Sequence, residues 1–312
     1  MVYTLTFCPC LEYSASLKEI SVGADNIISD GDLHVSGSGA VIAQVMSELG
    51  VSSTLLGFAA GFTGGEIEGI LRGRGVNTDL IYLEQGLSPL NTVLVHDDRG
   101  EQRTRFAAQQ LTISHNELMS LFSRLERLTN GDMLVLSGAV PPSVPADVYS
   151  HIPDAFAGND VRIVLDIPAE PLAKCLNLHP FLVVTDRKRL GETFGESPQS
   201  EEEVISYIMH IQELGAQNVL AYLEDSGMII LLDSGRMILK QQMPSGTRFN
   251  ETALNALAAG FIVGCVDKDV DNEYSLMLAS AAARAAADQR GIPSKSSMLA
   301  LMMEIMKQKA AE

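Results

Sequence analysis

The sequence has no tryptophan, four cysteines and few basic residues, and each shortage narrows what the chain can do. Its 22 lysines and arginines are outnumbered by 39 aspartates and glutamates, which gives a net charge of −17. Binding to nucleic acids requires a basic surface that neutralises phosphates and releases their counterions. We therefore expect no nucleic-acid partner.

Long hydrophobic runs are also missing. No apolar segment approaches the roughly 20 residues that a membrane-spanning helix needs. The first residues lack the basic region and small-residue cleavage site of a secretion signal. We therefore expect a cytoplasmic protein with no membrane partner. With 312 residues, 46% of them hydrophobic, the chain can bury a full core.

The cysteines do not indicate a metal centre. Cys8 and Cys10 form the only close pair, and Cys175 and Cys265 are isolated. Zinc sites combine two such pairs or a pair with histidines at regular spacing, and no second cluster accompanies this one. We therefore expect no cysteine-bound metal and no redox centre.

Buried strands alternate with helices along most of the chain. Apolar or β-branched runs predict strands at residues 1–7, 51–58, 132–136, 161–166, 181–184 and 218–223. Helical segments separate them, and the helix that begins at residue 115 starts with a capping box of Ser114 and Glu117. Three helices are expected near 251–265, 274–289 and 296–309. This order predicts an α/β fold with a mostly parallel central sheet covered by helices on both faces.

Two segments break the alternation of strands and helices. Residues 17–35 and 79–106 carry turn residues and short alternating runs, which are typical of half-exposed strands. We interpret insertions at about 11–35 and 80–107 as a small β-sheet lid over the carboxyl ends of the main strands, where ligands bind in such folds. No linker divides the chain, so 1–312 is predicted to be a single domain.

Several segments resemble the PfkB (ribokinase-like) carbohydrate kinases, in the branch that phosphorylates fructose or tagatose phosphates. The resemblance rests on residues 3–13, 57–64, 136–145, 164–166 and 259–261 and covers essentially the whole chain. It implies a three-layer α/β/α fold with a β lid, a sugar-phosphate substrate, ATP and Mg²⁺ as cofactors, and a homodimer formed through the lid.

The sugar side departs from the family pattern at several positions that the resemblance assigns to substrate. A family aspartate is replaced by Glu12, and a family Gly-Gly-Lys-Gly-x-Asn run reads Ser-Gly-Ser-Gly-Ala-Val at 36–41. A phosphate-gripping arginine falls at Pro89, which offers no donor, so the bidentate contact is lost. Five substrate-binding positions are kept as candidates beside Glu12: Gly37, Gly39, Asn91, Ser137 and Gly138.

The nucleotide side is altered as well. A family Lys-Pro-Asn-x-x-Glu motif corresponds to residues 184–189, where Asp186 stands in the motif and a basic residue replaces its acid. A Leu-Gly-x-Asp-Gly loop corresponds to 223–227, where Glu224 is followed by a second acid and only Gly227 survives in place. Two carboxylates there would repel a polyphosphate. We therefore expect binding of ATP and Mg²⁺ to be weakened.

The largest departure concerns the family's Gly-Ala-Gly-Asp turn, which corresponds to residues 252–255. The glycines would let amides at the helix start contact the transferred phosphoryl group, and the aspartate would act as base. Here Thr252 and Leu254 replace the glycines, and Asn255 replaces the base. The loss of a general base alone costs about 10²–10⁴ in rate. Glu251 remains an alternative base if the turn is shifted by four residues.

Three functions remain open. The altered residues favour a catalytically impaired kinase homologue that binds a sugar phosphate or an active paralogue. The second is an active kinase of a hexose phosphate, with Glu251 or Glu12 as a relocated acid. The third is a structural subunit with an empty cleft. Each altered position also has an ordinary structural reading, because Glu12 and Glu224 can be solvated surface acids and Asn255 a polar residue near a helix cap.

Overall fold

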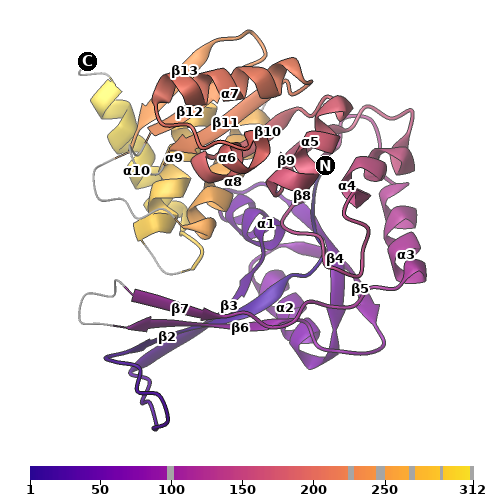
Figure 1. Ribbon diagram of the computed structural model, residues 1–312, viewed down its shortest axis with the longest axis vertical. Coiled ribbons are helices and arrows are strands. Elements are labelled where there is room, and N and C mark those ends of the chain that lie inside the picture. Colours follow the sequence, from indigo (N-terminus) through magenta and orange to yellow (C-terminus); the bar gives the residue numbers. More distant parts are fainter. Residues whose placement is uncertain (97–101, 224–227, 244–249, 267–270, 289–290, 310–312) are drawn as a thin grey trace.

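A nine-stranded sheet forms the centre of the molecule (Figure 1). The computed structural model describes residues 1–96, 102–223, 228–243, 250–266, 271–288 and 291–309. The strand order is β13-β12-β11-β10-β9-β8-β1-β4-β5, parallel from β11 to β5, with the hairpin β12–β13 antiparallel at one edge. The strands are β1 (Val2–Thr6), β4 (Ser53–Ala60), β5 (Asn77–Leu83), β8 (Met133–Ser137), β9 (Arg162–Asp166), β10 (Leu182–Asp186), β11 (Asn218–Leu223), β12 (Met228–Leu232) and β13 (Ile238–Gln242).

Helices cover both faces of this sheet, because successive side chains of each buried strand point to opposite sides. In β8, Leu134 and Leu136 belong to one core cluster and Val135 to the other. The first face carries α3 (His115–Leu125), α4 (Val148–His151), α5 (Ala169–Cys175), α6 (Arg187–Phe194) and α7 (Glu201–Glu213). The second carries α1 (Ser38–Glu48), α8 (Glu251–Val266), α9 (Asn272–Asp288) and α10 (Lys295–Lys309). None of the described helices is both long and apolar enough to cross a membrane.

Helix α8 lies at the centre of the second helical layer, and most of its residues are buried. A Cβ atom on Gly260 would lie 2.7 Å from the Cα atom of Ala279 in α9, and one on Gly264 would meet Ser275 at the same distance. These two glycines therefore allow α8 and α9 to approach closely. The contact holds the first turn of α8 in a defined place at the carboxyl edge of the sheet.

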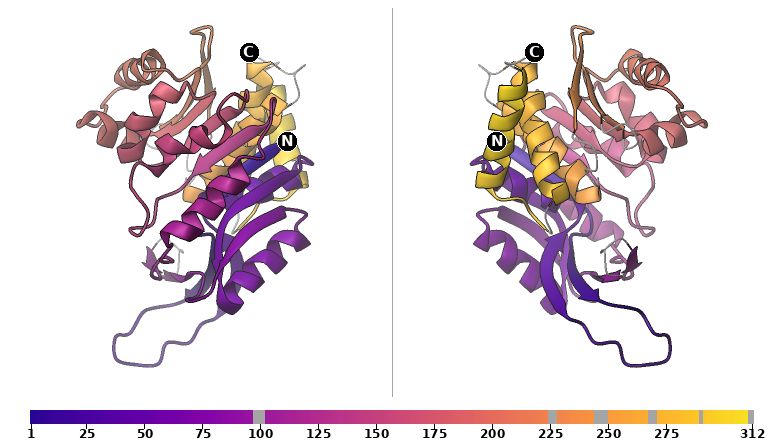
Figure 2. Two further views of the ribbon diagram at one scale, coloured as in Figure 1. Left: turned by 90° about the vertical axis from the view of Figure 1, so that its right-hand side faces the viewer. Right: turned by 90° about the vertical axis from the view of Figure 1, so that its left-hand side faces the viewer.

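A second, smaller sheet projects from this body (Figure 2). Its order is β3-β2-β6-β7, made of β2 (Cys10–Leu17), β3 (Asp30–Ser36), β6 (Leu90–His96) and β7 (Gln102–Phe106). Leu11 of β2 and Val35 of β3 are buried against α1 and α2 (Gly61–Gly73), which attaches the small sheet to the body. Glu12, His34 and Arg105 of this sheet line one cavity with residues of α8, so the sheet lies beside the first turn of α8.

The predicted α/β fold with a large, mostly parallel sheet and a second, smaller sheet is confirmed. The capping box of Ser114 and Glu117 is also present. The short strands expected within 17–35 are present only at its two ends, because β2 ends at Leu17, β3 begins at Asp30, and between them Asn26 bonds the backbone of Ser21 and Ala24. Residues 80–83 belong to β5 of the large sheet, so the second segment enters the small sheet only at Leu90.

Candidate functional site

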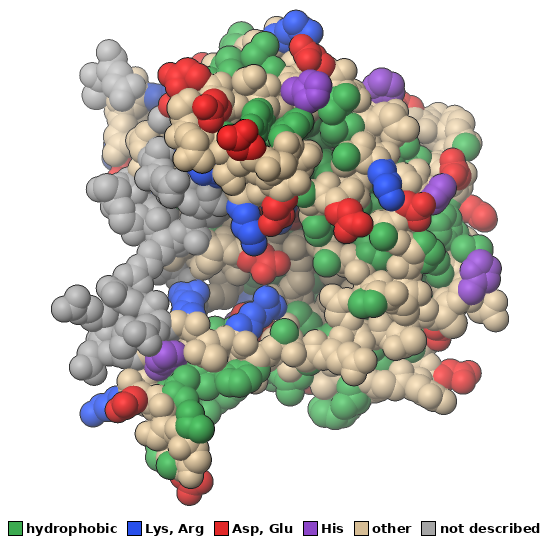
Figure 3. Space-filling view, in the orientation of Figure 1, with side chains coloured by type: hydrophobic (Ala, Val, Ile, Leu, Met, Phe, Trp, Pro, Cys, Tyr) green, Lys and Arg blue, Asp and Glu red, His purple; other side chains and the backbone are tan. Residues whose placement is uncertain are grey.

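Three adjoining cavities open at the carboxyl edge of the large sheet, and Glu251 lines all of them. The α6 cavity, about 400 Å³, lies between α6 and the first turn of α8. The small-sheet cavity, about 240 Å³, lies between the small sheet and α8, and the floor cavity, about 260 Å³, lies beneath it. Figure 3 shows this face hollowed where basic and acidic side chains gather between body and small sheet.

The first turn of α8 is closed by its own cap. Asn250 precedes the helix, and its side-chain oxygen accepts a hydrogen bond of 2.9 Å from the amide of Ala253. The amide of Leu254 bonds the carbonyl of Asn250 at 3.1 Å. The side-chain cap therefore satisfies the amide of Ala253, a donor that a bound anion would otherwise take, whereas the amide of Leu254 makes the first backbone bond of the helix.

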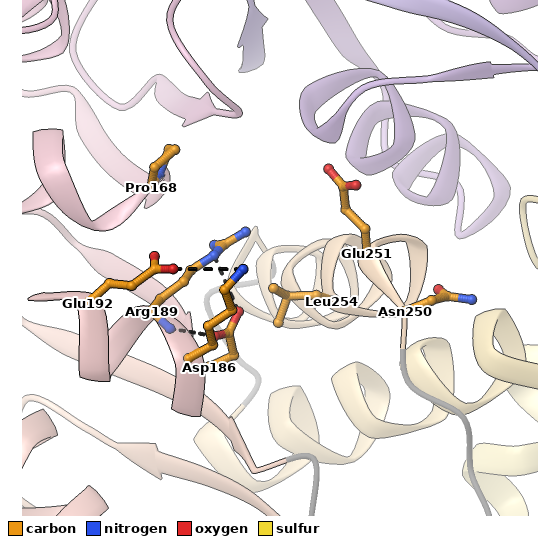
Figure 4. A pocket seen from close by; sticks show the side chains of 8 residues that line it. Pro168, Asp186, Arg189, Glu192, Asn250, Glu251 and Leu254 are labelled. Carbon is orange, nitrogen blue, oxygen red and sulfur yellow. Dashed lines mark hydrogen bonds and ion pairs between the residues drawn. The ribbon is translucent and has the colours of Figure 1, made fainter. Parts of the chain in front are cut away.

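Two side chains in this turn stand at the positions that the family resemblance assigns to the anion hole and to the base. Leu254 points toward the side chains of Asp186 and Arg189 and closes that end of the α6 cavity (Figure 4). Asn255 is 2% exposed, and its carboxamide oxygen has no hydrogen-bond partner among the described residues. A carboxamide cannot accept a proton at neutral pH, so this position offers no general base.

The α6 cavity is dominated by an arginine held between two carboxylates. Arg189 lies in the first turn of α6, and its Nη1 atom is 2.6 Å from Oδ1 of Asp166. Its Nε atom is 3.3 Å from Oδ2 of Asp186, the residue that caps α6. Burial lowers the pKa of Arg189, but Asp166, Asp186 and Glu251 more than offset it, so that pKa lies above its ordinary value.

The charge around the α6 cavity is negative. Its lining contains three carboxylates, Asp186, Glu192 and Glu251, against the two cations Lys188 and Arg189. Lys188 pairs with Glu192 at 3.7 Å, while Asp166 adds a further negative charge behind Arg189. A polyphosphate entering this cavity would meet more negative than positive charge.

The small-sheet cavity carries a different set of side chains. Arg103 and Arg105 lie two residues apart on β7 and therefore share one face of the strand. Both line the cavity, together with His34 of β3 and Glu12 of β2. Arg105 is 48% exposed and lies 3.5 Å from Glu12 and 3.9 Å from Glu251. Two arginines therefore face a space whose lining has two carboxylates, and neither arginine is locked in place.

Glu12 is tied to the small sheet itself. Its Oε1 atom lies 3.5 Å from Nε2 of His34, its partner in the β2–β3 ladder. Hydrogen bonding with His34 and the charges of Arg105 and Arg103 lower the pKa of Glu12, against the opposing effect of burial. A carboxylate with a lowered pKa is a weak proton acceptor, so Glu12 suits ligand contact better than base catalysis.

The floor cavity contains some of the predicted substrate-binding residues and leaves others behind it. Gly37, Asn91 and Gly138 line the cavity. Gly39 and Ser137 lie one layer deeper, where the amide of Gly39 bonds Oγ1 of Thr6 at 2.7 Å and the hydroxyl of Ser137 bonds the carbonyl of Leu5. These two residues therefore hold strands and helix together rather than face the cavity.

The structure thus brings most of the predicted site residues to one place. Thr252, Asn255 and Glu12 line the small-sheet cavity, and Asp186 and Leu254 line the α6 cavity. Glu224 and Gly227 lie outside the described residues.

Sequence analysis missed several participants, among them Arg189, which pairs with Asp166 and Asp186. The basic pair Arg103 and Arg105 was signalled by its two-residue spacing on a predicted strand. Asn250 and His34 carried no such signal, because a cap and a cross-strand partner are recognised only once the backbone is known.

Comparisons with known proteins agree on one family. Residues 10–297 match the family model described as pfkB family carbohydrate kinase. The chain is 30% identical over 293 residues to 1-phosphofructokinase of Bacillus subtilis, covering 93% of this chain and 94% of the relative. It is 31% identical to 1-phosphofructokinase of Borreliella burgdorferi, covering 84% of each.

Solved structures share the fold. The phosphofructokinase-2 of Escherichia coli in complex with fructose-6-phosphate superposes with a TM-score of 0.88 at 20% identity, covering 98% of this chain and 99% of the other. At this identity the likeness establishes the fold alone.

Proposed function

Because the chain belongs to the pfkB family of carbohydrate kinases, we propose that it binds a hexose phosphate beneath its small sheet and does not transfer a phosphoryl group. The hexose phosphate is suggested by relatives named 1-phosphofructokinase and D-tagatose-1-phosphate kinase. In this proposal the small sheet acts as a lid over the ligand.

The phosphate of the ligand is assigned to Arg105, with Arg103 beside it. Arg105 lines both the small-sheet and the floor cavity, and a guanidinium can contact two phosphate oxygens at once. Arg105, on β7, would supply the phosphate donor that is missing at Pro89. The floor cavity, with the amides and hydroxyls near Gly37 and Ser38, then receives the sugar.

The observation that carries the loss of transfer is the first turn of α8. At the position that the resemblance assigns to the family base stands the buried carboxamide of Asn255, and in the expected anion hole the amide of Ala253 is bonded to the side chain of Asn250. ATP, which the family implies, does not fit the residues that face the α6 cavity, because its phosphates would meet three carboxylates and Leu254. Mg²⁺ does not fit either, because the guanidinium of Arg189 already occupies the carboxylates of Asp166 and Asp186.

The test measures ligand binding and turnover separately. Thermal unfolding is recorded with fructose 1-phosphate, fructose 6-phosphate, tagatose 6-phosphate and Mg·ATP, singly and in pairs. We expect a sugar phosphate alone to raise the melting temperature, because a ligand at a hundred times its Kd adds about 2.7 kcal/mol to the free energy of unfolding. Sugar-dependent formation of ADP would refute the loss of transfer, and no stabilisation by any ligand would point to a structural subunit.

A second candidate is an active kinase that uses Glu251 as its base. It is favoured by one observation: the side chain of Glu251 is 63% exposed and lines all three cavities. Its carboxylate can therefore reach a hydroxyl group bound in any of them. If the protein shows hexose phosphorylation, Glu251→Gln should abolish it while the melting temperature stays unchanged. Asn255→Ala is the matched variant that should leave such activity in place.

The partner that we propose is a second copy of this chain, bound through the outer face of the small sheet. The register aligns Leu33, Tyr13, Thr92 and Phe106 in one row across the four strands. Leu33 and Phe106 are exposed by 43% and 56%. Phe106→Glu should convert a dimer to a monomer in sedimentation velocity without loss of fold, and a monomeric parent protein would rule out this partner.

A further inference from the structure

Two acidic side chains converge where β9 and β10 end. Asp166 is the last residue of β9 and is fully buried, and Asp186 is the last residue of β10. The two strands are parallel neighbours, so both carboxylates emerge at the same edge of the sheet. A pair of carboxylates in such a place is a ready set of oxygen ligands for a hard divalent cation.

The space between these carboxylates is taken by the side chain of Arg189. Its guanidinium bonds Oδ1 of Asp166 at 2.6 Å and lies 3.3 Å from Oδ2 of Asp186, while its backbone amide bonds the other oxygen of Asp186 at 2.7 Å. The backbone of α6 and the side chain of Arg189 thus hold the pair together. Arg189 is itself only 19% exposed.

This arrangement does not fit a magnesium ion. Mg²⁺ requires oxygen ligands at near-octahedral positions and retains several waters, and here a positive group already occupies the carboxylates. Among the described residues, no three His, Cys, Asp or Glu side chains gather as a metal site. One oxygen of Asp166 is nevertheless left buried without a hydrogen-bond partner in the described part of the chain. The guanidinium contacts only Oδ1 of Asp166, and a metal cation bound between the two acids would coordinate Oδ2 as well.

We propose that the guanidinium of Arg189 permanently replaces a divalent cation between Asp166 and Asp186, so that this end of the α6 cavity holds no exchangeable metal ion. The guanidinium offsets one of the two negative charges, where a divalent cation would offset both, and it does so without an exchangeable ion. This inference rests on the ion pairs alone and holds whether or not the small sheet binds a hexose phosphate.

The first experiment measures binding of Mn²⁺ by electron paramagnetic resonance to the full chain. The parent protein should show only weak binding to its acidic surface, unchanged in Lys188→Ala, which removes a neighbouring positive charge that does not contact the two acids. Arg189→Ala should gain one tighter Mn²⁺ equivalent, and Arg189→Ala with Asp186→Asn should lose it. A tight site in the parent protein that disappears in Asp166→Asn would overturn the proposal.

A stability measurement keeps the test decisive if Arg189→Ala folds poorly. The melting temperature of this variant should rise on addition of Mn²⁺ or Mg²⁺, whereas neither ion should shift that of the parent protein or of Arg189→Lys. If the variant gains neither a Mn²⁺ equivalent nor metal-dependent stability, Arg189 is an ordinary ion-pair partner and the inference fails. Failure of sugar-phosphate binding would leave all of these readouts unchanged, so the two proposals are separable.

Discussion

The α6 cavity and the small-sheet cavity are each lined by an arginine, but the two arginines differ in exposure and in ion pairing. Arg189, on the α6 side, is 19% exposed and lies within 3.3 Å of two carboxylates. Arg105, on the small-sheet side, is 48% exposed, and its nearest carboxylates are 3.5 and 3.9 Å away. A buried and fully paired cation holds the structure together, whereas an exposed and loosely paired one can exchange its partner for a ligand.

The same comparison underlies our proposal that an anion binds on the small-sheet side and not in the α6 cavity. On the α6 side, Arg189 pairs with Asp166 and Asp186, and Lys188 pairs with Glu192, so both cations of the lining already have carboxylate partners. On the small-sheet side, Arg103 and Arg105 lie on one strand face and balance the two acids of the lining. We therefore assign the charge of Arg189 to the stability of the fold and propose the charges of Arg103 and Arg105 for recognition of the ligand.

The largest expected effect is on the α6 side. Arg189→Ala should lower the free energy of unfolding by about 3–5 kcal/mol, because it leaves the buried Asp166 without its partner. Urea denaturation measures this, with Lys188→Ala, within about 0.5 kcal/mol of the parent, as control. The double variant Asp166→Leu/Arg189→Met should be more stable than Arg189→Ala. Equal losses in Arg189→Ala and Arg105→Ala would erase the distinction between the two sides.

Next in size is the effect of the exposed arginine on ligand binding. Arg105→Ala should weaken binding of a hexose phosphate by about 1.5–3 kcal/mol, or roughly 10- to 150-fold, since a hydrogen bond to a charged group has that strength. Its free energy of unfolding should change by less than about 1 kcal/mol. Isothermal titration calorimetry gives the affinity, and Arg72→Ala, an exposed arginine of α2 paired with Glu68, is the control.

A smaller effect should follow from removing the acid that competes with the ligand. Glu251→Gln removes a negative charge 3.9 Å from Arg105, so the hexose phosphate should bind more tightly by about 0.5–1 kcal/mol. The same titration measures it, and the gain should be absent in Arg105→Ala/Glu251→Gln. Weaker binding in the single variant would mean that Glu251 contacts the sugar rather than opposing the phosphate.

Sequence patterns predicted most of the fold, because strand and helix periodicity depends on local burial that each segment carries by itself. The same holds for the first turn of α8, where Leu254 and Asn255 could be read directly against a known pattern. The secondary structure of residues 18–29 could not be predicted, since a turn-rich polar segment is compatible with a loop as well as with a short strand. Asn26, which closes that loop on Ser21, shows its role only in the folded chain.

The electrostatics of the site were beyond the sequence for a physical reason. The run 187–189 reads as a solvated basic helix face, and Lys188 does behave so at 82% exposure. The next residue, Arg189, points inward instead, because its side chain bonds Asp166, which lies 23 residues earlier at the end of β9. A long-range pair of this kind depends on strand order and register, which no local window contains.

The smallest expected effect concerns pH and the small-sheet side. The pKa of Glu12 is lowered below its ordinary value of 4.5, first by hydrogen bonding with His34 and then by the charges of Arg105 and Arg103. In the unfolded chain Glu12 takes up its proton at higher pH than in the folded protein. Ionised Glu12 therefore adds stability that is fully present above about pH 4.5 and is lost as pH falls through the lowered pKa.

This contribution should be below about 1 kcal/mol, because Glu12 is partly open to solvent. Thermal unfolding from pH 7 to pH 3 measures it against Glu12→Gln, which should melt slightly lower than the parent at pH 7 and approach it at pH 3. Parallel curves over that range would show that Glu12 does not gain from folding.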